Sequence, residues 1–194
     1  MVVEGVFTEF PIIRAERLTL RKLSQDDTEK IFETFSNPRV MKCYGKFPMK
    51  ERSEAQELIN IFSKAFESSE AIRWGIELNS SKELIGTCGF HNWKKTHKRA
   101  EIGYELNEEA WGSGYMKEAV SAIIRYGFLE MELNRIEANV YPENTSSEEL
   151  LKKLGFRFEG LLKEYAYFRE KYQDLNMFSF LKKDYNRLYK EENR

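Results

Sequence analysis

The chain has 194 residues, of which 41% are hydrophobic and 14% aromatic, so it can bury a core and is not intrinsically disordered. Its 31 basic and 32 acidic side chains leave a formal net charge of -1, which gives no overall signal for nucleic acid or an anionic membrane as a partner. We expect one domain over residues 1–194, with a core at about 16–183 and a charged tail at about 184–194.

The first third of the chain predicts a strand and two helices. Arg17 to Arg21 alternates in polarity, which is typical of a strand. A helix is expected from Ser24 to Phe35, because an aspartate stands three residues after the candidate N-cap Ser24, as in a capping box. Val40 to Met49 is irregular and aromatic, and a second amphipathic helix is expected from Glu51 to Phe66.

Three strand-like runs follow, at Ile72 to Leu78, Leu84 to Trp93 and Ala100 to Leu106. The turns between them are short, which favours an antiparallel meander. The turn from Lys94 to Arg99 is basic, and it is the stretch that comes nearest to the basic stripe needed for nucleic-acid binding.

The remaining chain alternates helices and strands. A helix with one broad apolar face is expected from Met116 to Phe128, and a strand from Arg135 to Tyr141. A short helix then starts near residue 145, with a capping box made by Thr145 and Glu148 or by Ser146 and Glu149, and ends at Gly155. The last predicted strands are Phe156 to Leu162 and Leu175 to Lys182.

This order of elements predicts the α+β (mixed α/β) class. We expect a central, mostly antiparallel mixed sheet of about seven strands, flanked by helices.

Cellular compartment and metal content are predicted from what the sequence lacks. No apolar run approaches the roughly 20 residues that span a bilayer, and Met1 to Pro11 has no basic n-region, so we expect neither a membrane helix nor a signal peptide. Cys43 and Cys88 allow a disulfide or two thiols; we favour reduced thiols and a cytoplasmic protein. His91 and His97 do not complete a metal-ligand pattern, so no metal site is expected.

The segment most informative about chemistry is W-G-S-G-Y-M, at Trp111 to Met116, between a predicted strand and the longest predicted helix. Glycines allow successive amide N–H groups to point into one hollow, and the helix N-terminus adds a positive dipole, so the segment can hold a pyrophosphate. A plain helix-starting turn is the alternative. The segment lacks the G-K-[ST] ending of a P-loop, and it follows a meander instead of opening a βαβ unit as a Rossmann fingerprint does.

Several motifs in this order resemble the GNAT superfamily of N-acetyltransferases. They are A-E-I-G-Y-E-L at 100–106, the W-G-S-G-Y-M loop, N-x-x-S at 144–147 and K-L-G-F at 153–156. R-L-x-L-R at 17–21 and F-x-x-E-G at 156–160 bring the pattern closest to the branch that acetylates the N-terminal alanine or serine of ribosomal proteins. The resemblance spans about Glu16 to Lys183. It implies the GNAT fold and acetyl-CoA as the cofactor.

The resemblance also implies which residues bind the cofactor. The pyrophosphate is expected on the loop Trp111, Gly112, Ser113, Gly114, Tyr115 and Met116. Met116 replaces the usual small residue, and we expect its side chain to point back under the helix. The pantetheine arm is expected to lie like an added strand beside Glu105, Leu106 and Asn107. Asn144 is expected to contact the same arm, to cap the following helix, or to do both.

For catalysis, the resemblance makes Glu101 the candidate base, acting directly or through a water, because it matches the glutamate at the start of the family's fourth strand. A buried strand position is expected to raise its pKa into the working range. A solvent-facing or arginine-paired carboxylate is the alternative. The resemblance implies that a backbone N–H near Leu106 holds the oxyanion. Ser147 sits at the serine of the family's N-x-x-S motif, so the resemblance makes it the candidate donor of the thiolate proton. The family often uses a tyrosine instead, and a simple first-turn helix serine is the alternative.

Acceptor recognition is expected in the two most irregular aromatic segments, Val40 to Met49, with Tyr44 and Phe47, and Lys163 to Asp174, with Tyr165, Tyr167 and Phe168. Tyr44, Tyr165 and Tyr167 are the expected contacts. Ordinary core packing is the alternative for any single ring.

The leading hypothesis for function is acetyl transfer to the N-terminal alanine or serine of a protein, with a ribosomal protein as the partner. The alternatives are a small-molecule amine acetyltransferase, acting on a polyamine, amino sugar or amino-acid analogue, and a non-catalytic acyl-CoA-binding module. We expect no nucleic-acid or membrane partner. A homodimer is left open, and so is the identity of the amine.

Overall fold

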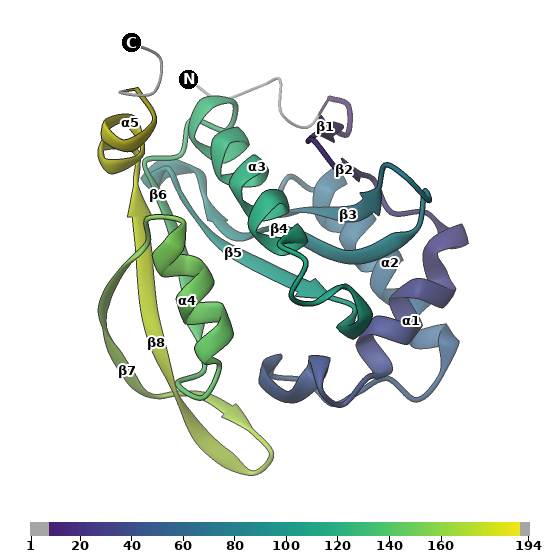
Figure 1. Ribbon diagram of the computed structural model, residues 1–194. Helices are drawn as coiled ribbons and strands as arrows, with labels where there is room; N and C mark the ends of the chain where they lie inside the picture. Colours follow the sequence, from purple (N-terminus) through teal and green to yellow (C-terminus); the bar gives the residue numbers. More distant parts are fainter. Residues whose placement is uncertain (1–7, 191–194) are drawn as a thin grey trace.

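The strands of this protein form one eight-stranded mixed sheet with helices on both faces (Figure 1). This computed structural model describes residues 8–190. Residues 1–7 and 191–194 lie outside the described residues; they include part of the N-terminal segment in which no signal peptide is expected, and part of the charged tail. The strands are β1 (Ile13–Arg14), β2 (Leu18–Arg21), β3 (Ile72–Leu78), β4 (Leu84–Lys94), β5 (Arg99–Leu106), β6 (Arg135–Val140), β7 (Arg157–Phe168) and β8 (Lys171–Leu181). The α-helices are α1 (Thr28–Ser36), α2 (Arg52–Glu67), α3 (Tyr115–Leu129), α4 (Thr145–Lys153) and α5 (Lys182–Lys190).

The sheet is mixed because of a single parallel pair. The strand order is β1-β2-β3-β4-β5-β6-β8-β7, and every neighbouring pair is antiparallel except β5 and β6. The expected α+β class and mostly antiparallel sheet are therefore confirmed, with eight strands in place of about seven. The added strand is the two-residue β1.

Two hydrophobic cores hold the helices against the sheet. The larger core joins β2–β6 and β8 to α3 and α4, with Trp74, Phe90 and Phe128 fully buried in it. The smaller core packs α1, through Ile31 and Phe35, and α2, through Ile59, against the other face. Alternation along each strand therefore sends side chains into opposite layers, which fixes the two faces of the site described below.

Strands β5 and β6 pair over only three residues each, from Arg99 to Glu101 and from Arg135 to Glu137. Beyond this point β5 continues to Leu106 beside β4 alone, while β6 continues beside β8. The sheet consequently opens between the two strands (Figure 1). One edge of β5 is left without a strand partner, and this is the main feature that positions the site.

The hairpin of β7 and β8 is much longer than expected. The predicted strands stopped at Leu162 and resumed at Leu175, whereas the structure continues both strands to a tight turn after Phe168. The expectation that Lys163 to Asp174 is irregular is therefore wrong. The register shifts between Leu162 and Ala166, and most β7 side chains are exposed, so no two-residue hydrophobic alternation marks the strand.

Helix ends were predicted with mixed success. The capping box of Ser24 and Asp27 is confirmed. The boxes proposed for the helix after residue 144 are wrong, because Asn144 itself is the N-cap and its side-chain oxygen accepts from the Ser147 N–H. Gly155 has the expected positive φ, at 99°. Helix α5 was missed, because its residues read as a strand end and a charged tail.

Cys43 and Cys88 are free thiols, in agreement with the reduced state that we favoured. Within residues 8–190, none of the helices combines the length and the apolar character that crossing a bilayer requires. The same part of the chain holds no group of three or more His, Cys, Asp or Glu placed to bind a metal ion.

The close approach of β3 and β4 generates a stability prediction. A Cβ at Gly89 would stand 2.1 Å from the Ile72 carbonyl oxygen, which is backbone, whereas a Cβ at Gly75 would meet only movable side-chain atoms of Leu84 and Leu23. We expect Gly89→Ala to lower the free energy of unfolding by about 2–3 kcal/mol and Gly75→Ala to lower it by clearly less, as measured by urea unfolding. Equal losses in the two variants would contradict this account of the strand contact.

Candidate active site

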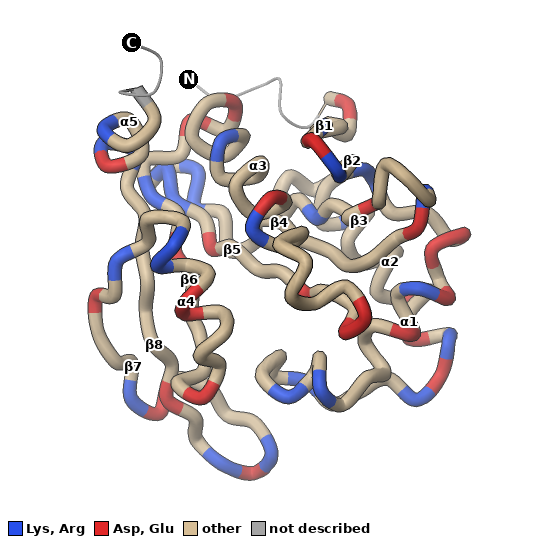
Figure 2. Tube along the Cα trace, in the orientation of Figure 1, with Lys and Arg blue, Asp and Glu red and all other residues tan. Residues whose placement is uncertain are grey.

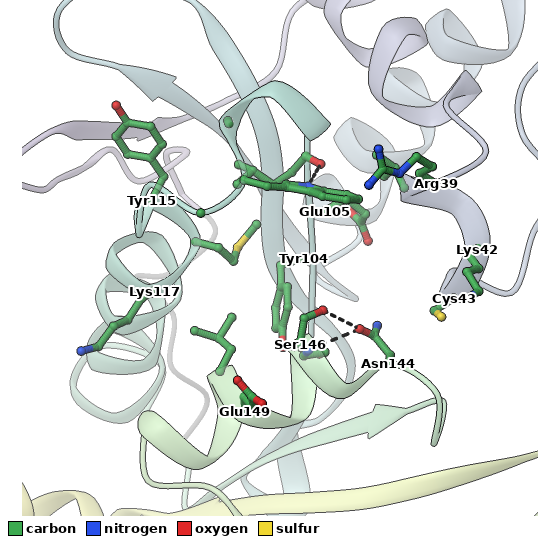
Figure 3. Close-up of a pocket in the computed structure, with 18 of the residues that line it drawn as sticks. Arg39, Lys42, Cys43, Tyr104, Glu105, Tyr115, Lys117, Asn144, Ser146 and Glu149 are labelled. Carbon is green, nitrogen blue, oxygen red and sulfur yellow. Dashed lines mark hydrogen bonds between the residues drawn. The ribbon is translucent and has the colours of Figure 1, made fainter.

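A cavity of about 890 Å³ lies beside the opening between β5 and β6 (Figure 3). Its walls come from the segment after α1, the end of β5, the loop before α3, and the start of α4. The lining residues used below are Val40, Lys42, Cys43, Tyr44, Tyr104, Glu105, Leu106, Trp111, Gly112, Gly114, Tyr115, Met116, Lys117, Asn144, Ser147 and Lys153. Most of the predicted site residues are therefore brought to one hollow.

The glycine loop before α3 has the backbone that anion binding needs. Gly112 and Gly114 have φ values of 75° and 79°, and Gly114 is the N-cap of α3. A Cβ at Gly112 would meet nothing within 4 Å, and one at Gly114 would meet only Arg17, at 3.5 Å. Packing therefore does not require glycine at either position; the left-handed backbone and its exposure to the cavity do. Lys117, in the first turn of α3, and Lys153, at the end of α4, add positive charge to the lining of the cavity.

The loop is held from outside the cavity by Arg17. Its guanidinium donates to the Ser113 carbonyl (2.9 Å) and to Glu118 (2.7 Å), and it lies 4.6 Å from the centre of the Tyr115 ring. Ser113 thus faces Arg17 and does not line the cavity. Met116 packs against the larger core, as expected for a side chain that points back under the helix. It also lines the cavity, which was not expected.

The open edge of β5 presents backbone groups to the cavity. The Asn107 N–H donates to the Ile85 carbonyl (2.8 Å), so in the antiparallel alternation Glu105 also bonds towards β4. Tyr104 and Leu106 therefore direct their N–H and C=O groups to the opposite, unpaired edge. This edge is suited to an extended ligand that adds like a strand.

Two of the three residues predicted to lie along this edge line the cavity, and the third does not. Glu105 and Leu106 do, while the Asn107 side chain accepts from the Glu109 N–H (3.1 Å) and caps the short turn that follows. The Leu106 carbonyl is occupied by the Trp111 indole N–H (2.9 Å), which leaves its N–H as the free backbone group there.

A pair of hydroxyls lies on the α4 side of the cavity. The Tyr104 and Ser147 oxygens are 2.6 Å apart, and both residues line the cavity. Burial raises the pKa of Tyr104 to about 12, against a smaller opposite effect of the Ser147 hydrogen bond, so the phenol stays protonated at neutral pH. Tyr104 was not predicted as a site residue; its place on the same strand face as Ile102 was the signal that could have found it.

Asn144 is the N-cap of α4 and also lines the cavity. Its side-chain oxygen accepts from the Ser147 N–H (3.3 Å) and from the Ser146 hydroxyl (3.1 Å), as Figure 3 shows for the labelled pair. The capping role is established by these bonds. A contact between Asn144 and a cofactor arm remains compatible with them.

Glu101 lies on the other face of β5 and is not among the residues that line the cavity. Burial acts to raise its pKa, but His91, together with hydrogen bonds from Asn92 (2.9 Å) and Asn139 (3.0 Å), outweighs burial and holds the pKa below its usual value. The expectation of a raised pKa is therefore wrong. The reason is that the sequence did not reveal these three partners.

Glu105 is the second carboxylate on this face, and it is also engaged. It forms an ion pair with Arg73 and accepts from the Thr87 hydroxyl (2.9 Å), with both charged side chains nearly buried. Removing either charge would leave the other one buried without compensation. Glu105 is thus a structural anchor at the cavity wall, with no spare capacity as a strong base.

The predicted acceptor residues are separated by the structure. Tyr44 lines the cavity, and burial raises the pKa of its hydroxyl, against a smaller effect of Arg73. Tyr165 and Tyr167 are not among the lining residues; they are 59% and 65% exposed on the β7–β8 hairpin, and Tyr167 packs against Tyr172. Both lie in a regular strand, two positions apart, so their side chains share its solvent-exposed face and do not reach the cavity as they could from an irregular loop.

Comparisons with known proteins show what this chain is similar to. The profile of the acetyltransferase (GNAT) domain matches residues 17–157. The chain is 42% identical over 173 residues to the uncharacterised N-acetyltransferase YoaA of Bacillus subtilis (strain 168), covering 89% of this chain and 98% of the relative. It is 27% identical to the [ribosomal protein uS5]-alanine N-acetyltransferase of Escherichia coli (strain K12), over 88% of this chain and 91% of that protein.

Among solved structures, the spermidine N-acetyltransferase of Vibrio cholerae, in complex with CoA and spermine, superposes with a TM-score of 0.76. It is 27% identical and covers 87% of this chain and 98% of that one.

The glycine loop generates a binding prediction. Gly114→Val places a branched side chain at a φ of 79°, which removes the backbone hollow while leaving the cores intact. We expect coenzyme A affinity, measured by calorimetry, to fall at least about tenfold, a loss of about 1.4 kcal/mol. The free energy of unfolding should fall by less than that. Ser113→Ala is the matched control and should keep wild-type affinity; an intact affinity in Gly114→Val would reject the loop as the diphosphate site.

Proposed function

This chain belongs to the GNAT family of acetyltransferases and is an acetyl-CoA-dependent N-acetyltransferase, and we propose that its acceptor is the N-terminal amine of a protein that begins with alanine or serine, such as a ribosomal protein. The uS5-alanine N-acetyltransferase relative supports this class of acceptor. The observation that carries the proposal is that both carboxylates on the acceptor face of β5, Glu101 and Glu105, already have partners.

The chemistry of the amine explains why engaged carboxylates favour this acceptor. An α-amino group has a pKa of about 7.7–8.0, so a useful fraction is neutral near pH 7.4, whereas a lysine amine, with a pKa of about 10.4, is neutral about once in a thousand. A site whose candidate base, Glu101, has a lowered pKa is therefore better matched to an amine that needs little deprotonation. An N-terminal α-amine meets this condition.

We assign the reacting groups as follows. The diphosphate of acetyl-CoA is held by the loop at Gly112 and Gly114, and its arm lies along the open edge of β5. The Leu106 N–H is the free donor for the thioester oxygen. The amine nitrogen bonds to the carbonyl carbon as the carbon–sulfur bond breaks, and the thiolate takes a proton from the Ser147–Tyr104 hydroxyl pair.

The nitrogen must also lose a proton, and Glu101 remains our candidate to receive it. After attack the nitrogen carries a positive charge and is far more acidic than the free amine, so a carboxylate of low pKa can accept its proton, directly or through a water. Glu101 would then act late in the reaction and would not be needed to deprotonate the free amine.

A polyamine is the second candidate acceptor, because the acceptor side of this protein is partly closed. The Phe47 ring lies 5.1 Å from the Phe168 ring across the space between the segment after α1 and the β7–β8 hairpin. A slim amine tolerates a narrowed approach better than a long peptide does. The spermidine N-acetyltransferase among the structural neighbours supports this alternative.

The test is an acetyl-CoA turnover screen read by thiol release. Alanyl and seryl peptides are compared with spermidine and with the same peptides blocked by N-acetylation as matched controls. We expect turnover of the free alanyl and seryl peptides and none of the blocked ones. Turnover of spermidine alone would replace the proposed acceptor with the second candidate.

The lowered pKa of Glu101 generates a prediction about pH. A carboxyl whose pKa lies below 4.5 is ionised throughout pH 6–9, so its titration cannot shape the profile there. We expect kcat/KM for an alanyl peptide to rise with pH to a midpoint near the amine pKa, about 8. Glu101→Gln should lower the rate without moving the midpoint, in steady-state assays from pH 6 to 9. A shifted midpoint would show that Glu101 titrates in this range.

A further inference from the structure

The chain segment after α1, residues 37–47, crosses one side of the cavity and is called the strap here. Its first end is tied to the turn that precedes the glycine loop. The Asn37 amide donates to Glu108 (2.9 Å), Arg39 forms an ion pair with the same carboxylate, and the Arg39 guanidinium lies 5.6 Å from the centre of the Trp111 ring. The strap is thus anchored beside the cofactor loop.

The other end of the strap meets the tip of the β7–β8 hairpin. The Phe47 ring lies 5.1 Å from that of Phe168, and the Arg169 guanidinium lies 5.8 Å and 5.1 Å from the two ring centres. We call these three side chains the aromatic clasp. It joins the strap to the hairpin tip, which lies more than 120 residues later in the sequence.

Between its two ends the strap forms a wall of the cavity. Val40, Lys42, Cys43 and Tyr44 line the cavity, and Figure 3 shows Lys42 and Cys43 across from Tyr115 and Lys117. The strap backbone is also close to the end of β6, since a Cβ at Gly45 would stand 3.2 Å from the Tyr141 hydroxyl. Phe47, Phe168 and Arg169 are not among the residues that line the cavity; their contacts join the far end of this wall to the hairpin.

The aromatic clasp is not part of what holds the fold together. Neither phenylalanine belongs to the two hydrophobic cores of the described residues, and Phe47 is 65% exposed. Phe168 is half-buried, and contacts of an exposed ring and an arginine with one half-buried ring are weak compared with buried core packing. The clasp can consequently open without unfolding the protein, and an acceptor that forces it open loses only these contacts.

We propose that the aromatic clasp selects acceptors by the size of the group next to the reacting amine. This inference rests on the proposed function in placing the acceptor amine on this side of the cavity. An alanine or serine side chain passes under the closed clasp, whereas a large side chain must separate Phe47 from Phe168. Small first residues are thereby favoured by exclusion of large ones, which is specificity through an unfavourable contact.

Phe47→Ala and Phe168→Ala test the aromatic clasp. Alanyl, seryl, phenylalanyl and tryptophanyl peptides of otherwise identical sequence are compared by kcat/KM. We expect the ratio of alanyl to tryptophanyl rates to fall at least about tenfold in both variants, with the KM for acetyl-CoA and the melting temperature unchanged. Tyr167→Ala is the matched control, because Tyr167 is an exposed ring on the same hairpin that packs on Tyr172 instead.

The outcomes separate the clasp from the proposed function. Unchanged ratios in Phe47→Ala and Phe168→Ala, or an equal change in Tyr167→Ala, would overturn the clasp even if the wild type acetylates alanyl peptides. If the wild type acetylates only spermidine, the proposed acceptor fails, and the clasp is judged by the ratio of spermidine to its N-benzyl derivative in the same variants.

A second measurement keeps the test independent of turnover. Calorimetry compares two bisubstrate analogues, in which an acetyl bridge links coenzyme A to alanine amide or to tryptophan amide. The wild type should bind the alanine analogue more tightly, and both clasp variants should reduce the difference at least about tenfold. An undiminished difference in either variant would reject the clasp as the size filter.

Discussion

The early end of the parallel pairing between β5 and β6 is the constraint on which the site depends. The two strands separate after Glu101 and Glu137. Backbone N–H and C=O groups that lose a strand partner near the interior require another one. At the Leu106 carbonyl the Trp111 indole supplies it, while the neighbouring N–H stays open to the cavity. Sheet geometry thus creates both the space and the hydrogen-bonding edge for an extended ligand.

The two faces of β5 divide the chemistry. Tyr104, which is hydrogen-bonded to Ser147 in the first turn of α4, has a protonated hydroxyl on one face. Glu101 and Glu105 lie on the other, each held by hydrogen bonds that keep it charged or buried in an ion pair. Strand alternation alone separates the Tyr104–Ser147 hydroxyl pair from the carboxylates. This separation suits a reaction in which a proton leaves nitrogen on one side and reaches sulfur on the other.

Much of the fold could be predicted from local sequence patterns, and the misses lie where no such pattern exists. The meander from Ile72 to Leu106 and the glycine loop carry local signals: alternation, short turns and positive-φ glycines. The length of the β7–β8 hairpin did not follow, because an exposed strand has no buried face that would leave a hydrophobic pattern. Asn144 was an expected cap of α4 and is its N-cap, but the capping boxes expected for its two neighbours are wrong. The low pKa of Glu101 depends on side chains from β4 and β6.

The sequence by itself determined most of the order of the elements, the glycine loop before α3 and the family resemblance, because each of these depends on residues that are near one another along the chain. Only the tertiary structure decided which groups meet across the sheet. It joined Tyr104 to Ser147, surrounded Glu101 with His91, Asn92 and Asn139, and brought Phe47 against Phe168. Such contacts depend on strand register and on where two strands part, which no local pattern specifies.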